Sequence, residues 1–324
     1  MNPLVSFCLK SYNGRRYLRE ALAGAFAQTY RPLEIVVSDD ASTDGSWEEI
    51  SGFCASHAVP DGVKIVLNRN PKNLGNLGNW EKLCELASGE LLVKADGDDV
   101  SLPERTERIV AAWTADGGAA TVICHSGWRI GLRGEKKGRI RNSSVGAELG
   151  AAMAFSRRVY MAFGPSGMDP RLPDDAVYVR RAQMLGPALE IPDRLVRYRL
   201  GSGVSSDEWN MRARIRFYAE GSVRVVQAML TWLDRPDVTV SASEGWRRRF
   251  QEELRQGQAR LTLVSSPRFQ ERLAAARVRG RCGFLSAIGF LRTAFLMPRG
   301  LGDLMLFGYV LVRNTMRRTG GAVR

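Results

Sequence analysis

The sequence predicts an α/β fold: a Rossmann-like, mostly parallel β-sheet with helices on both faces, followed by a mostly helical C-terminal region. Short apolar runs of strand length alternate with segments of helical periodicity through the first part of the chain. Such alternation produces βαβ units and therefore a parallel sheet. Two of the apolar runs end in carboxylates, at Asp39 and at Asp96. Basic residues concentrate after residue 204, which marks a region with a different role.

The first two strand–helix units lie within residues 4–56. Residues 4–9 form an apolar run with β-branched and aromatic side chains, which predicts the first strand. A turn-rich segment follows it, and apolar residues then recur at helical spacing to about residue 28. Residues 33–38 predict the second strand, and a helix is predicted from about residue 47 to residue 56.

The next units continue the same alternation. Residues 63–67 predict the third strand, and residues 68–79 form a segment dense in Asn and Gly. A helix is predicted over residues 80–87, and residues 91–93 predict a fourth, buried strand. That strand runs directly into the sequence Asp96-Gly97-Asp98-Asp99.

The remaining elements are shorter and less regular. Further helices are predicted over residues 105–113, 156–163 and 177–185, and short strands over residues 121–124, 127–132, 189–191 and 195–198. Residues 133–141 form a loop or a hairpin tip. The glycine-containing segment 201–203 predicts a boundary between a first domain, residues 1–204, and a C-terminal region, residues 205–324.

Composition narrows the classes of function. The 324 residues, 44% of them hydrophobic, can bury one large core or two modest ones. Five scattered cysteines without a CxxC pair predict neither a zinc site nor a disulfide framework, and favour a reducing compartment. Only two histidines are present, which excludes catalysis resting on several of them, and His125 beside an apolar run is predicted to lie in the core. No signal peptide or spanning helix is predicted.

The carboxylates that follow two of the strands are the first candidate site. The carboxyl ends of parallel strands meet at one edge of a sheet, where ligands bind. Three carboxylates within residues 96–99 repel one another unless a cation compensates them. Aspartate oxygens suit Mg²⁺ or Mn²⁺, which share their coordination sphere with substrate phosphates. An acidic surface turn is the alternative for an isolated Asp-Gly-Asp.

Four separated motifs occur in a fixed order along these elements. They are residues 5–14, ending in Ser11-Tyr12-Asn13-Gly14; residues 36–46, containing Ser38-Asp39-Asp40; residues 73–80, containing Asn73-Leu74-Gly75; and residues 96–104, containing Asp96-Gly97-Asp98-Asp99. In this combination the chain resembles the family 2 glycosyltransferases, over roughly residues 3–204. The resemblance implies the GT-A nucleotide-diphospho-sugar transferase fold.

The resemblance also implies roles at the nucleotide end of a sugar donor. Asp39 would accept the N3–H of a uracil or thymine ring, which favours a UDP- or dTDP-sugar. Ser11, Tyr12 and Asn13 would lie against the base and the ribose. Asp96 would approach the ribose or the sugar hydroxyls.

Further roles concern the diphosphate. The resemblance implies that Asp98 binds a Mn²⁺ or Mg²⁺ ion that bridges the two phosphates, with Asp99 in support. Lys94 is a candidate for a contact with a phosphate, although a charge at a strand end is more often solvated. Arg199 or the loop over residues 202–206 is expected to contact the diphosphate. Many family members carry a histidine after this arginine, and Leu200 occupies that position here.

The resemblance implies an inverting transfer, which needs a carboxylate that takes the proton from the acceptor hydroxyl. The family places this base in an acidic pair that opens a helix. Asp174 and Asp175 precede the helix predicted over residues 177–185. We expect Asp175 to be the base, with Asp174 as the alternative; a simple helix N-cap is the competing role.

The C-terminal region is strongly basic. Residues 205–324 contain 21 Lys and Arg against 10 Asp and Glu. Helices are predicted over residues 209–233, 246–263 and 269–278, with two apolar segments after them. Basic amphipathic helices with aromatic residues bind anionic membrane surfaces, but they also pack as bundles with a solvated arginine face. Both alternatives stay open, and no nucleic-acid partner is expected because no recognised binding motif accompanies the charge.

Taken together, the sequence predicts a metal-dependent glycosyltransferase that acts on a glycan or lipid-linked acceptor in cell-surface polysaccharide biosynthesis. Its expected location is the cytoplasm, on or near the inner face of the cytoplasmic membrane. A nucleotidyltransferase on a similar sheet is an alternative, although residues 11–16 fit poorly the Gly- and basic-rich loop that such enzymes carry. A membrane- or polyanion-binding protein with a degenerate catalytic domain is the non-enzymatic alternative.

Overall fold

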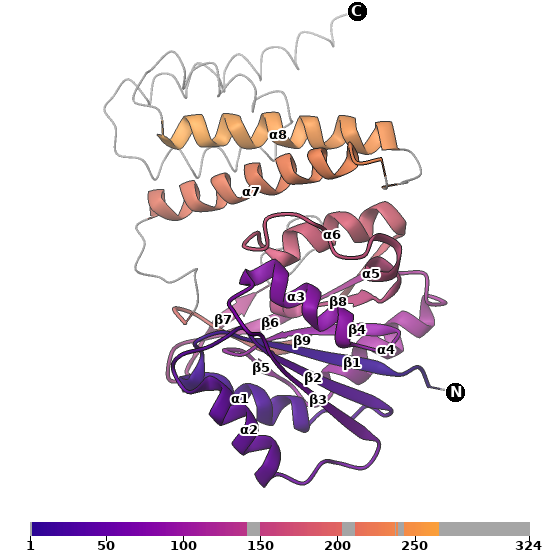
Figure 1. The fold of residues 1–324 in the computed structure, drawn as a ribbon, viewed down its shortest axis with the longest axis vertical. Coiled ribbons are helices and arrows are strands. Elements are labelled where there is room, and N and C mark those ends of the chain that lie inside the picture. The colour runs from indigo at the N-terminus through magenta and orange to yellow at the C-terminus, as the bar shows by residue number, and fades with distance from the viewer. Residues whose placement is uncertain (1, 141–149, 203–210, 237, 239–242, 266–324) are drawn as a thin grey trace, which may run out of the picture. The chain divides into compact units, whose positions relative to one another are not determined.

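The structure, a computed structural model, describes residues 2–140, 150–202, 211–236, 238 and 243–265. The chain divides into two compact units, Met1–Ser206 and Asp207–Arg324. The first unit is a sheet with helices on both faces, and the described part of the second consists of two helices (Figure 1). The predicted α/β class and the helical character of the described C-terminal residues are confirmed.

The sheet of the first unit is mixed. Its strands are β1 (Val5–Ser11), β2 (Leu33–Asp39), β3 (Val63–Arg69), β4 (Leu91–Asp96), β5 (Val100–Ser101), β6 (Val122–Ile130), β7 (Lys136–Ile140), β8 (Met153–Ser156) and β9 (Ala188–Arg199). They follow the order β3-β2-β1-β4-β8-β6-β9-β5, and β7 pairs with β6. Strands β1 to β4 are parallel, β8 runs antiparallel to β4 and β6, and β9 runs parallel to β6. The carboxyl ends of β1, β2, β4, β6 and β9 therefore lie at one edge.

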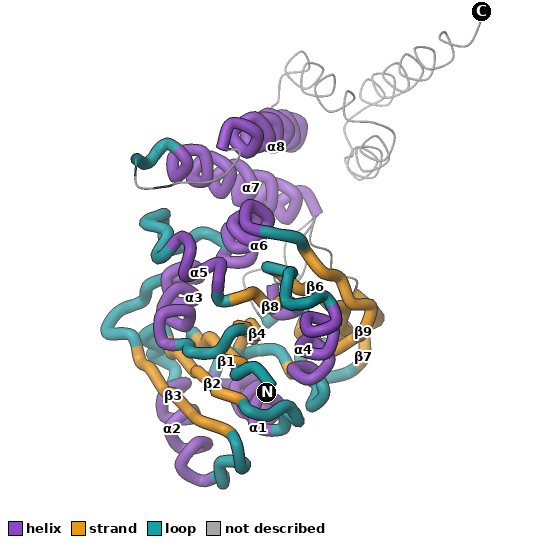
Figure 2. Tube along the Cα trace, turned by 90° about the vertical axis from the view of Figure 1, so that its right-hand side faces the viewer, coloured by secondary structure: helices purple, strands orange, loops and turns teal. Residues whose placement is uncertain are grey.

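Helices cover both faces of this sheet. They are α1 (Arg15–Phe26), α2 (Ser46–Ser56), α3 (Gly75–Leu86), α4 (Arg105–Ala115), α5 (Arg158–Phe163) and α6 (Asp174–Leu185), with a 3₁₀ turn at Gly150–Ala152. Two views show α1 and α2 on one face and α3, α5 and α6 on the other (Figures 1 and 2).

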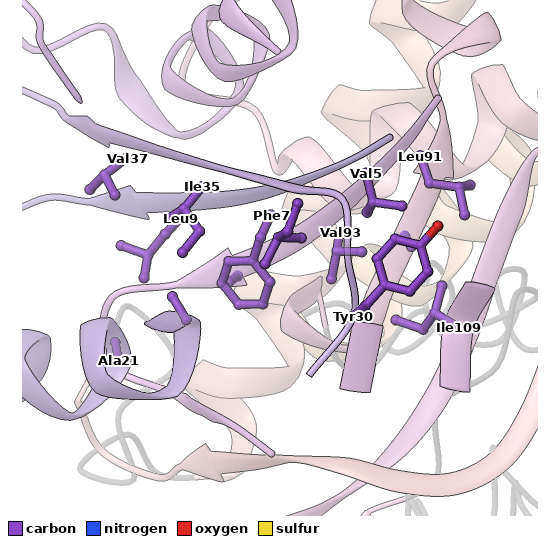
Figure 3. Packing of buried hydrophobic residues seen from close by; sticks show 14 of the residues in the cluster. Val5, Phe7, Leu9, Ala21, Tyr30, Ile35, Val37, Leu91, Val93 and Ile109 are labelled. Atoms are coloured by element: carbon purple, nitrogen blue, oxygen red, sulfur yellow. The ribbon is translucent and has the colours of Figure 1, made fainter. Parts of the chain in front are cut away.

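The core follows from the alternation of side chains along the strands. On the face covered by α1, α2 and α4, β1 contributes Val5, Phe7 and Leu9, which pack with residues of β2, β4 and the helices (Figure 3). The opposite face holds Trp80, Phe155 and Tyr178, whose ring centroids lie 5.7–5.8 Å apart in tilted and edge-on arrangements. Apolar side chains thus cover both faces of the sheet, and the polar side chains gather at the ends of its strands.

The histidine expected in the core is buried there. His125 is 1% exposed, and Nε of Arg105 donates to its Nε2 at 2.9 Å. Its Nδ1 lies 2.8 Å from the carbonyl oxygen of Ser126. Burial and the neighbouring guanidinium lower the pKa of His125 well below its usual value, so the ring is neutral and donates from Nδ1.

Two long strands replace four short predicted ones. The sequence predicts breaks inside β6 and inside β9, but each is continuous. The pairing register passes from His125 opposite Ile191 to Ser126 opposite Arg194, so two residues of β9 bulge out of the ladder. One of them is Pro192, which has no N–H to donate to a neighbouring strand. The sequence does not predict strand β8, because its four residues are too few to show the alternation of apolar and polar side chains that marks a strand.

Helix α3 begins at Gly75, five positions before the residue at which the sequence predicts it. Its first turn depends on Asp40, whose carboxylate accepts the N–H groups of Leu74 at 2.8 Å and Gly75 at 2.9 Å. Gly75 has φ +79°, and a Cβ there would lie 2.9 Å from the carbonyl oxygen of Pro170. The glycines that suggest a loop in the sequence therefore permit close packing at the helix start.

We expect Asp40→Ala to lower the free energy of unfolding by about 1–3 kcal/mol, because two backbone N–H groups lose their acceptor. Chemical denaturation of the variant measures this loss. Asp61→Ala, at an exposed position, is the matched control and should change stability little. Equal stability of the two variants would show that Asp40 does not support the start of α3.

The second unit consists, in its described part, of α7 (Met211–Leu233) and α8 (Ser243–Ser265), which pack on each other. Some arginines there are paired: Arg216 with Glu220 at 2.7 Å and Arg249 with Glu253 at 3.2 Å. The helix predicted over residues 269–278 and the later apolar segments lie outside the described residues. Among the helices that the structure describes, none is both long and apolar enough to cross a membrane.

Candidate functional site

The strand register places charged side chains together at the carboxyl edge of the sheet. Lys10 of β1 pairs in register with Asp96 of β4, and Ser11 pairs with Asp39 of β2. The two acidic strand ends predicted from the sequence therefore flank the same strand. The prediction that they meet at one edge of the sheet agrees with this register.

A compact set of charges extends from this edge to α6. We call Lys10, Lys94, Asp96, Asp174 and Asp175 the lysine–aspartate cluster. The Lys10 ammonium lies 3.2 Å from Asp96 Oδ1 and 2.8 Å from Asp174 Oδ2. The Lys94 ammonium lies 3.3 Å from Asp96 Oδ2 and 3.3 Å from Asp174 Oδ2. Two ammonium groups therefore connect the last residue of β4 with the first residue of α6.

The charges within this cluster shift the pKa values of its members. Burial acts to raise the pKa of Asp96, but the charges of Lys10 and Lys94 outweigh it and lower that pKa to about 2. Lys94 is only 1% exposed; burial acts to lower its pKa, yet Asp174 and Asp96 outweigh this and raise it. Asp96 and Lys94 are therefore both charged at neutral pH.

Asp175 differs from its neighbour. Both residues lie in the first turn of α6, after the N-cap residue Pro173. Asp174 Oδ1 accepts the N–H of Asp175 at 2.9 Å, and Asp175 Oδ1 accepts the N–H of Ala176 at 2.7 Å. Burial and the charge of Asp174 raise the pKa of Asp175 above its usual value. A carboxylate with a raised pKa is typical of a general base.

A glycine brings backbone close to this pair. At Gly150, at the start of the 3₁₀ turn, a Cβ would lie 2.9 Å from Asp175 Oδ2 and 3.1 Å from the Lys94 ammonium. A larger residue at this position would displace one of these charged groups. The turn therefore forms a close wall beside the Asp175 carboxylate.

The loop that carries Asp98 and Asp99 is fastened to the end of β9. Ser202 Oγ donates to Asp98 Oδ2 at 2.8 Å, and the backbone N–H of Arg199 donates to Asp99 Oδ1 at 2.7 Å. The other oxygen, Asp99 Oδ2, is buried without a hydrogen-bond partner in the described part of the chain. Burial together with the charge of Asp96 raises the pKa of Asp98, and burial with neighbouring carboxylates raises that of Asp99.

Arg199 lies in the wall behind this loop. Its Nε donates to the carbonyl oxygen of Asp98 at 3.0 Å, and its guanidinium pairs with Glu20 at 3.0 Å and stacks over the ring of Tyr17. It is 2% exposed. These contacts make Arg199 a clamp on the Asp98 loop, and its contact with a diphosphate stays a prediction.

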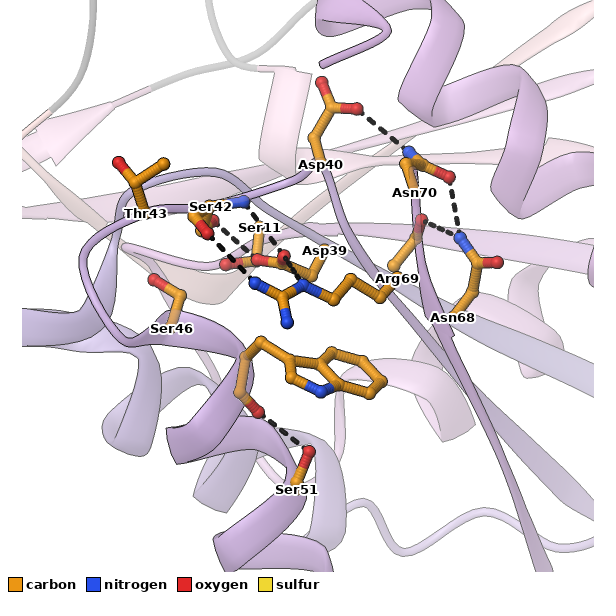
Figure 4. A network of polar contacts seen from close by, with 12 residues as sticks. Ser11, Asp39, Asp40, Ser42, Thr43, Ser46, Ser51, Asn68, Arg69 and Asn70 are labelled. Atoms are coloured by element: carbon orange, nitrogen blue, oxygen red, sulfur yellow. Dashed lines mark hydrogen bonds and ion pairs between the residues drawn. The ribbon is translucent and has the colours of Figure 1, made fainter. Parts of the chain in front are cut away.

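Asp39 lies beneath the loop that follows β2, and is 0% exposed (Figure 4). Its carboxylate accepts the Ser42 N–H at 3.0 Å and the Ser42 hydroxyl at 2.5 Å, and Arg69 Nε lies 3.8 Å away. The side chain is thus oriented by its own loop and by one guanidinium. Its contact with a base stays a prediction.

The loop after β1 is tied to the same segment. Asn13 has φ +47°, and its Oδ1 accepts the N–H of Thr43 at 2.9 Å. The N–H of Asn13 donates to Ser42 Oγ at 2.9 Å. The buried hydroxyl of Ser11 has no partner among the described residues, and Tyr12 is 54% exposed. An unpaired hydroxyl and an exposed aromatic ring on a fixed loop are suited to contact a ligand.

The donor atoms at this edge fit a divalent ion only in part. Among the described residues, no group of three or more His, Cys, Asp or Glu side chains could hold a metal ion. Mg²⁺, however, is commonly held by one or two carboxylates together with substrate phosphates. The unpartnered, buried oxygen of Asp99 and the adjacent Asp98 supply such carboxylates, whereas both lysines neutralise Asp96. The residues therefore fit a metal site that a diphosphate completes.

Sequence reasoning missed Lys10 and Asn76. The Lys10 ammonium hydrogen-bonds to Asn76 Oδ1, and Asn76 Nδ2 donates to Asp174 at 3.1 Å. Lys10 precedes the last residue of β1 and so lies at the same sheet edge as Asp39 and Asp96, a position that could have revealed it. The prediction that Lys94 would most often be solvated is wrong, because the side chain is buried and paired.

Comparison with protein families gives a match over half of the chain. The model described as "Glycosyl transferase family 2" matches residues 6–167. Among curated proteins, "Putative glycosyltransferase EpsE" of Bacillus subtilis (strain 168) is 33% identical over 109 residues. That stretch is 34% of this chain and 38% of EpsE, so this chain covers less than two thirds of that relative.

Solved structures resemble the fold over most of the chain. The mannosyltransferase PcManGT from Pyrobaculum calidifontis, in complex with GDP-Man and Mn²⁺, matches with a TM-score of 0.57 and 17% identity, covering 100% of this chain and 89% of its own. S. aureus TarS 1-349 in complex with UDP-GlcNAc matches with a TM-score of 0.56 and 15% identity, covering 86% and 80%. At these identities the likeness shows the fold alone, and it confirms the GT-A fold predicted from the sequence.

Proposed function

Because this chain belongs to glycosyl transferase family 2, we propose that it is an inverting glycosyltransferase that uses a nucleotide-diphosphate sugar. The acceptor is a hydroxyl group of a glycan or a lipid-linked saccharide, in cell-surface polysaccharide biosynthesis. We place the reaction at the cytoplasmic face of the membrane. The second unit, through its basic helices, is the candidate for contact with that membrane or with the acceptor.

One observation carries this proposal. The buried Lys94 ammonium contacts Asp96, the last residue of β4, and also Asp174, at the start of α6. Residues that the family resemblance assigns to the donor and to the base, distant in sequence, are thereby joined through one side chain. The alternative for the Asp-Gly-Asp sequence is an acidic turn on the surface. Such a turn would need no buried lysine that connects it with a distant helix.

The donor lies along the edge formed by β1, β2 and β4. Asp39 accepts a base N–H, and Ser11, Tyr12 and Asn13 line the base and ribose. The exposed ring of Tyr12 and the unpaired hydroxyl of Ser11 support this placement. The TarS structure holds a uridine nucleotide and the PcManGT structure a guanosine nucleotide, so the fold leaves the base open. The role of Asp39 favours UDP or dTDP.

Asp96, Lys94 and Arg199 act at the sugar and phosphate end. Asp96 stays ionised at neutral pH because its pKa is lowered to about 2, so it can accept hydrogen bonds from sugar or ribose hydroxyls. Lys94 holds Asp96 and Asp174 in place and adds positive charge beside the phosphates. Arg199 keeps the Asp98 loop against β9.

Asp98 would hold a Mn²⁺ or Mg²⁺ ion together with the donor diphosphate, with Asp99 beside it. When bound, such an ion neutralises the charge that develops on the departing nucleoside diphosphate. Supporting this assignment, Asp98 and Asp99 form no ion pair with a lysine in the described part of the chain, whereas Asp96 pairs with both Lys10 and Lys94.

The chemistry is a single displacement at the anomeric carbon. The acceptor oxygen forms a bond to C1 as the bond from C1 to the phosphate oxygen breaks, and the leaving diphosphate takes that electron pair. Asp175 takes the acceptor proton. Asp175 is preferred over Asp174 because Asp174 already receives both ammonium groups. The raised pKa of Asp175 supports its role, since it increases the basicity of the carboxylate.

We expect Asp98→Ala to abolish the thermal stabilisation that a nucleotide-diphosphate sugar gives in the presence of Mn²⁺. A panel of UDP-, dTDP- and GDP-sugars, measured by thermal shift with and without Mn²⁺, identifies the donor in the wild-type protein and tests the variant. Asp61→Ala serves as the surface control. Metal-independent stabilisation that survives in Asp98→Ala would remove the metal role, and the absence of any stabilising nucleotide sugar would remove the proposed function.

A further inference from the structure

A cavity of about 320 Å³ lies among strands β6, β7 and β9 of the first unit. Its lining residues define what we call the Trp128 pocket: Leu102, Trp128, Ile130, Gly134, Lys136 and Arg197. They come from β6, from the β6–β7 turn, from β7, from β9 and from the segment after β5. None of these residues has a role in the reaction described above.

The one aromatic ring in the lining of the pocket, that of Trp128, has several cations around it. Strand pairing puts Arg139 of β7 and Arg197 of β9 opposite Trp128, one on each side. The Lys136 ammonium lies 4.9 Å from the centre of the indole ring, the Arg194 guanidinium 5.1 Å and that of Arg139 5.7 Å. Positive charges gathered around one ring repel one another unless an anion compensates them.

Nearby carboxylates in the described part of the chain are already engaged. Glu135 pairs with Lys137 at 3.1 Å, and Asp193 pairs with Arg108 at 2.8 Å. Among the described residues, Lys136 and Arg197 have no carboxylate within 4 Å. The lining of the pocket therefore carries positive charge that no carboxylate of the described residues neutralises, and this charge can attract an anionic ligand.

The pocket lies next to the proposed reaction centre. Arg197 is two residues before Arg199, the clamp on the Asp98 loop, and alternate residues of a strand share one face. Ile130 of the pocket is followed by Gly131, whose carbonyl oxygen accepts from Arg199 at 3.3 Å. A ligand in this pocket would thus be held by the strands that position the Asp98 loop.

We propose that the Trp128 pocket binds an acidic pyranose unit of the acceptor glycan, with the sugar ring against the indole face and its carboxylate on Lys136 and Arg197. This inference rests on the proposed function. The indole ring together with Leu102 and Ile130 provides apolar surface for the C–H face of a sugar, and arginine binds carboxylates with two parallel hydrogen bonds. The concave lining suits one saccharide unit, whereas a bilayer would need apolar side chains that project outward.

The test compares two oligosaccharides that differ mainly in charge. Tetragalacturonate is titrated against galactotetraose, its neutral counterpart, by calorimetry and by tryptophan fluorescence. We expect the wild-type protein to bind tetragalacturonate, and Lys136→Glu and Arg197→Glu each to weaken that binding about tenfold or more. Trp128→Ala should weaken it as well. Lys72→Glu carries the same charge change at an exposed position outside the pocket and should leave binding unchanged.

Thermal stabilisation by the nucleotide sugar reports separately on the fold and on the donor site of each variant. It should be the same in Lys136→Glu, Arg197→Glu and wild type, since both side chains are exposed and lie outside the donor edge. Three results would overturn the proposal. The wild type could bind the acidic and the neutral oligosaccharide with equal affinity, or Lys72→Glu could weaken the binding of tetragalacturonate as much as Lys136→Glu and Arg197→Glu do. The protein could also bind phosphatidylglycerol vesicles but not tetragalacturonate. If no nucleotide sugar stabilises the wild-type protein, that result would instead count against the proposed function.

Discussion

Asp175→Asn is expected to lower the turnover number for sugar transfer about 10²–10⁴-fold, the usual contribution of a general base. The amide retains the shape of the side chain but cannot accept the proton of the acceptor hydroxyl. Donor binding should persist, because Asp175 is assigned no contact with the nucleotide. Coupled detection of nucleoside diphosphate release measures the turnover number, and thermal shift measures donor binding.

The same substitution should not destabilise the protein at neutral pH. Burial and Asp174 raise the pKa of Asp175 in the folded state above its unfolded value, so the ionised form disfavours folding at pH values above the unfolded pKa. An uncharged amide removes this cost. Asp175→Asn is therefore expected to unfold at the same temperature as the wild type or higher, which separates loss of catalysis from loss of structure.

The raised pKa also predicts the pH profile. The wild-type kcat/KM should fall on acidification at a pH above the value of about 3.9 at which an ordinary aspartate titrates. Asp61→Asn, at an exposed position, should reproduce the wild-type profile. A turnover number in Asp175→Asn within a few-fold of wild type would exclude Asp175 as the base and would return the role to Asp174.

Lys94→Met is expected to lower the free energy of unfolding by about 3–5 kcal/mol, the usual cost of removing one partner from a buried ion pair. Lys94 is 1% exposed and lies 3.3 Å from both Asp96 and Asp174, so its loss leaves buried negative charge with one ammonium in place of two. Urea denaturation monitored by circular dichroism gives the difference. Donor stabilisation should weaken as well, because Asp96 loses a partner that fixes its position.

Two further variants make this result specific. Lys82→Met removes a partly exposed lysine that pairs with Glu85 at 3.1 Å on the surface of α3, and should change stability by about 1 kcal/mol or less. Asp174→Asn added to Lys94→Met should restore part of the lost stability, because the uncompensated carboxylate is removed. A Lys94→Met variant as stable as Lys82→Met would contradict a structural role for the lysine–aspartate cluster.

Much of this arrangement could be predicted because it depends on local pattern. The apolar runs before Asp39 and Asp96 predict strands, and parallel pairing necessarily brings their carboxyl ends to one edge. The acidic pair at residues 174 and 175 lies in the first turn of a helix, as its sequence context indicates. The four motifs in order predicted the fold family, which the family match and the solved structures confirm.

The rest depends on contacts between distant segments, which local pattern does not contain. A lysine within a strand reads as a surface charge, and only the approach of α6 turns Lys94 into a buried link to Asp174. Similarly, the role of Asp40 follows from the position of α3, not from its place after β2. The Trp128 pocket forms where three strands and a turn converge, so its cations lie together in the fold although they are spread over residues 136–197.

The configuration of the sugar released from the donor tests the central claim most directly. With water in place of the acceptor, a nucleotide sugar identified by the thermal-shift panel is hydrolysed slowly, and proton NMR records the anomer formed before mutarotation. A single displacement assisted by Asp175 predicts that an α-linked donor first yields the β-anomer, and that Asp175→Asn suppresses its formation. Initial release of the α-anomer, or an unchanged rate in Asp175→Asn, would contradict the account.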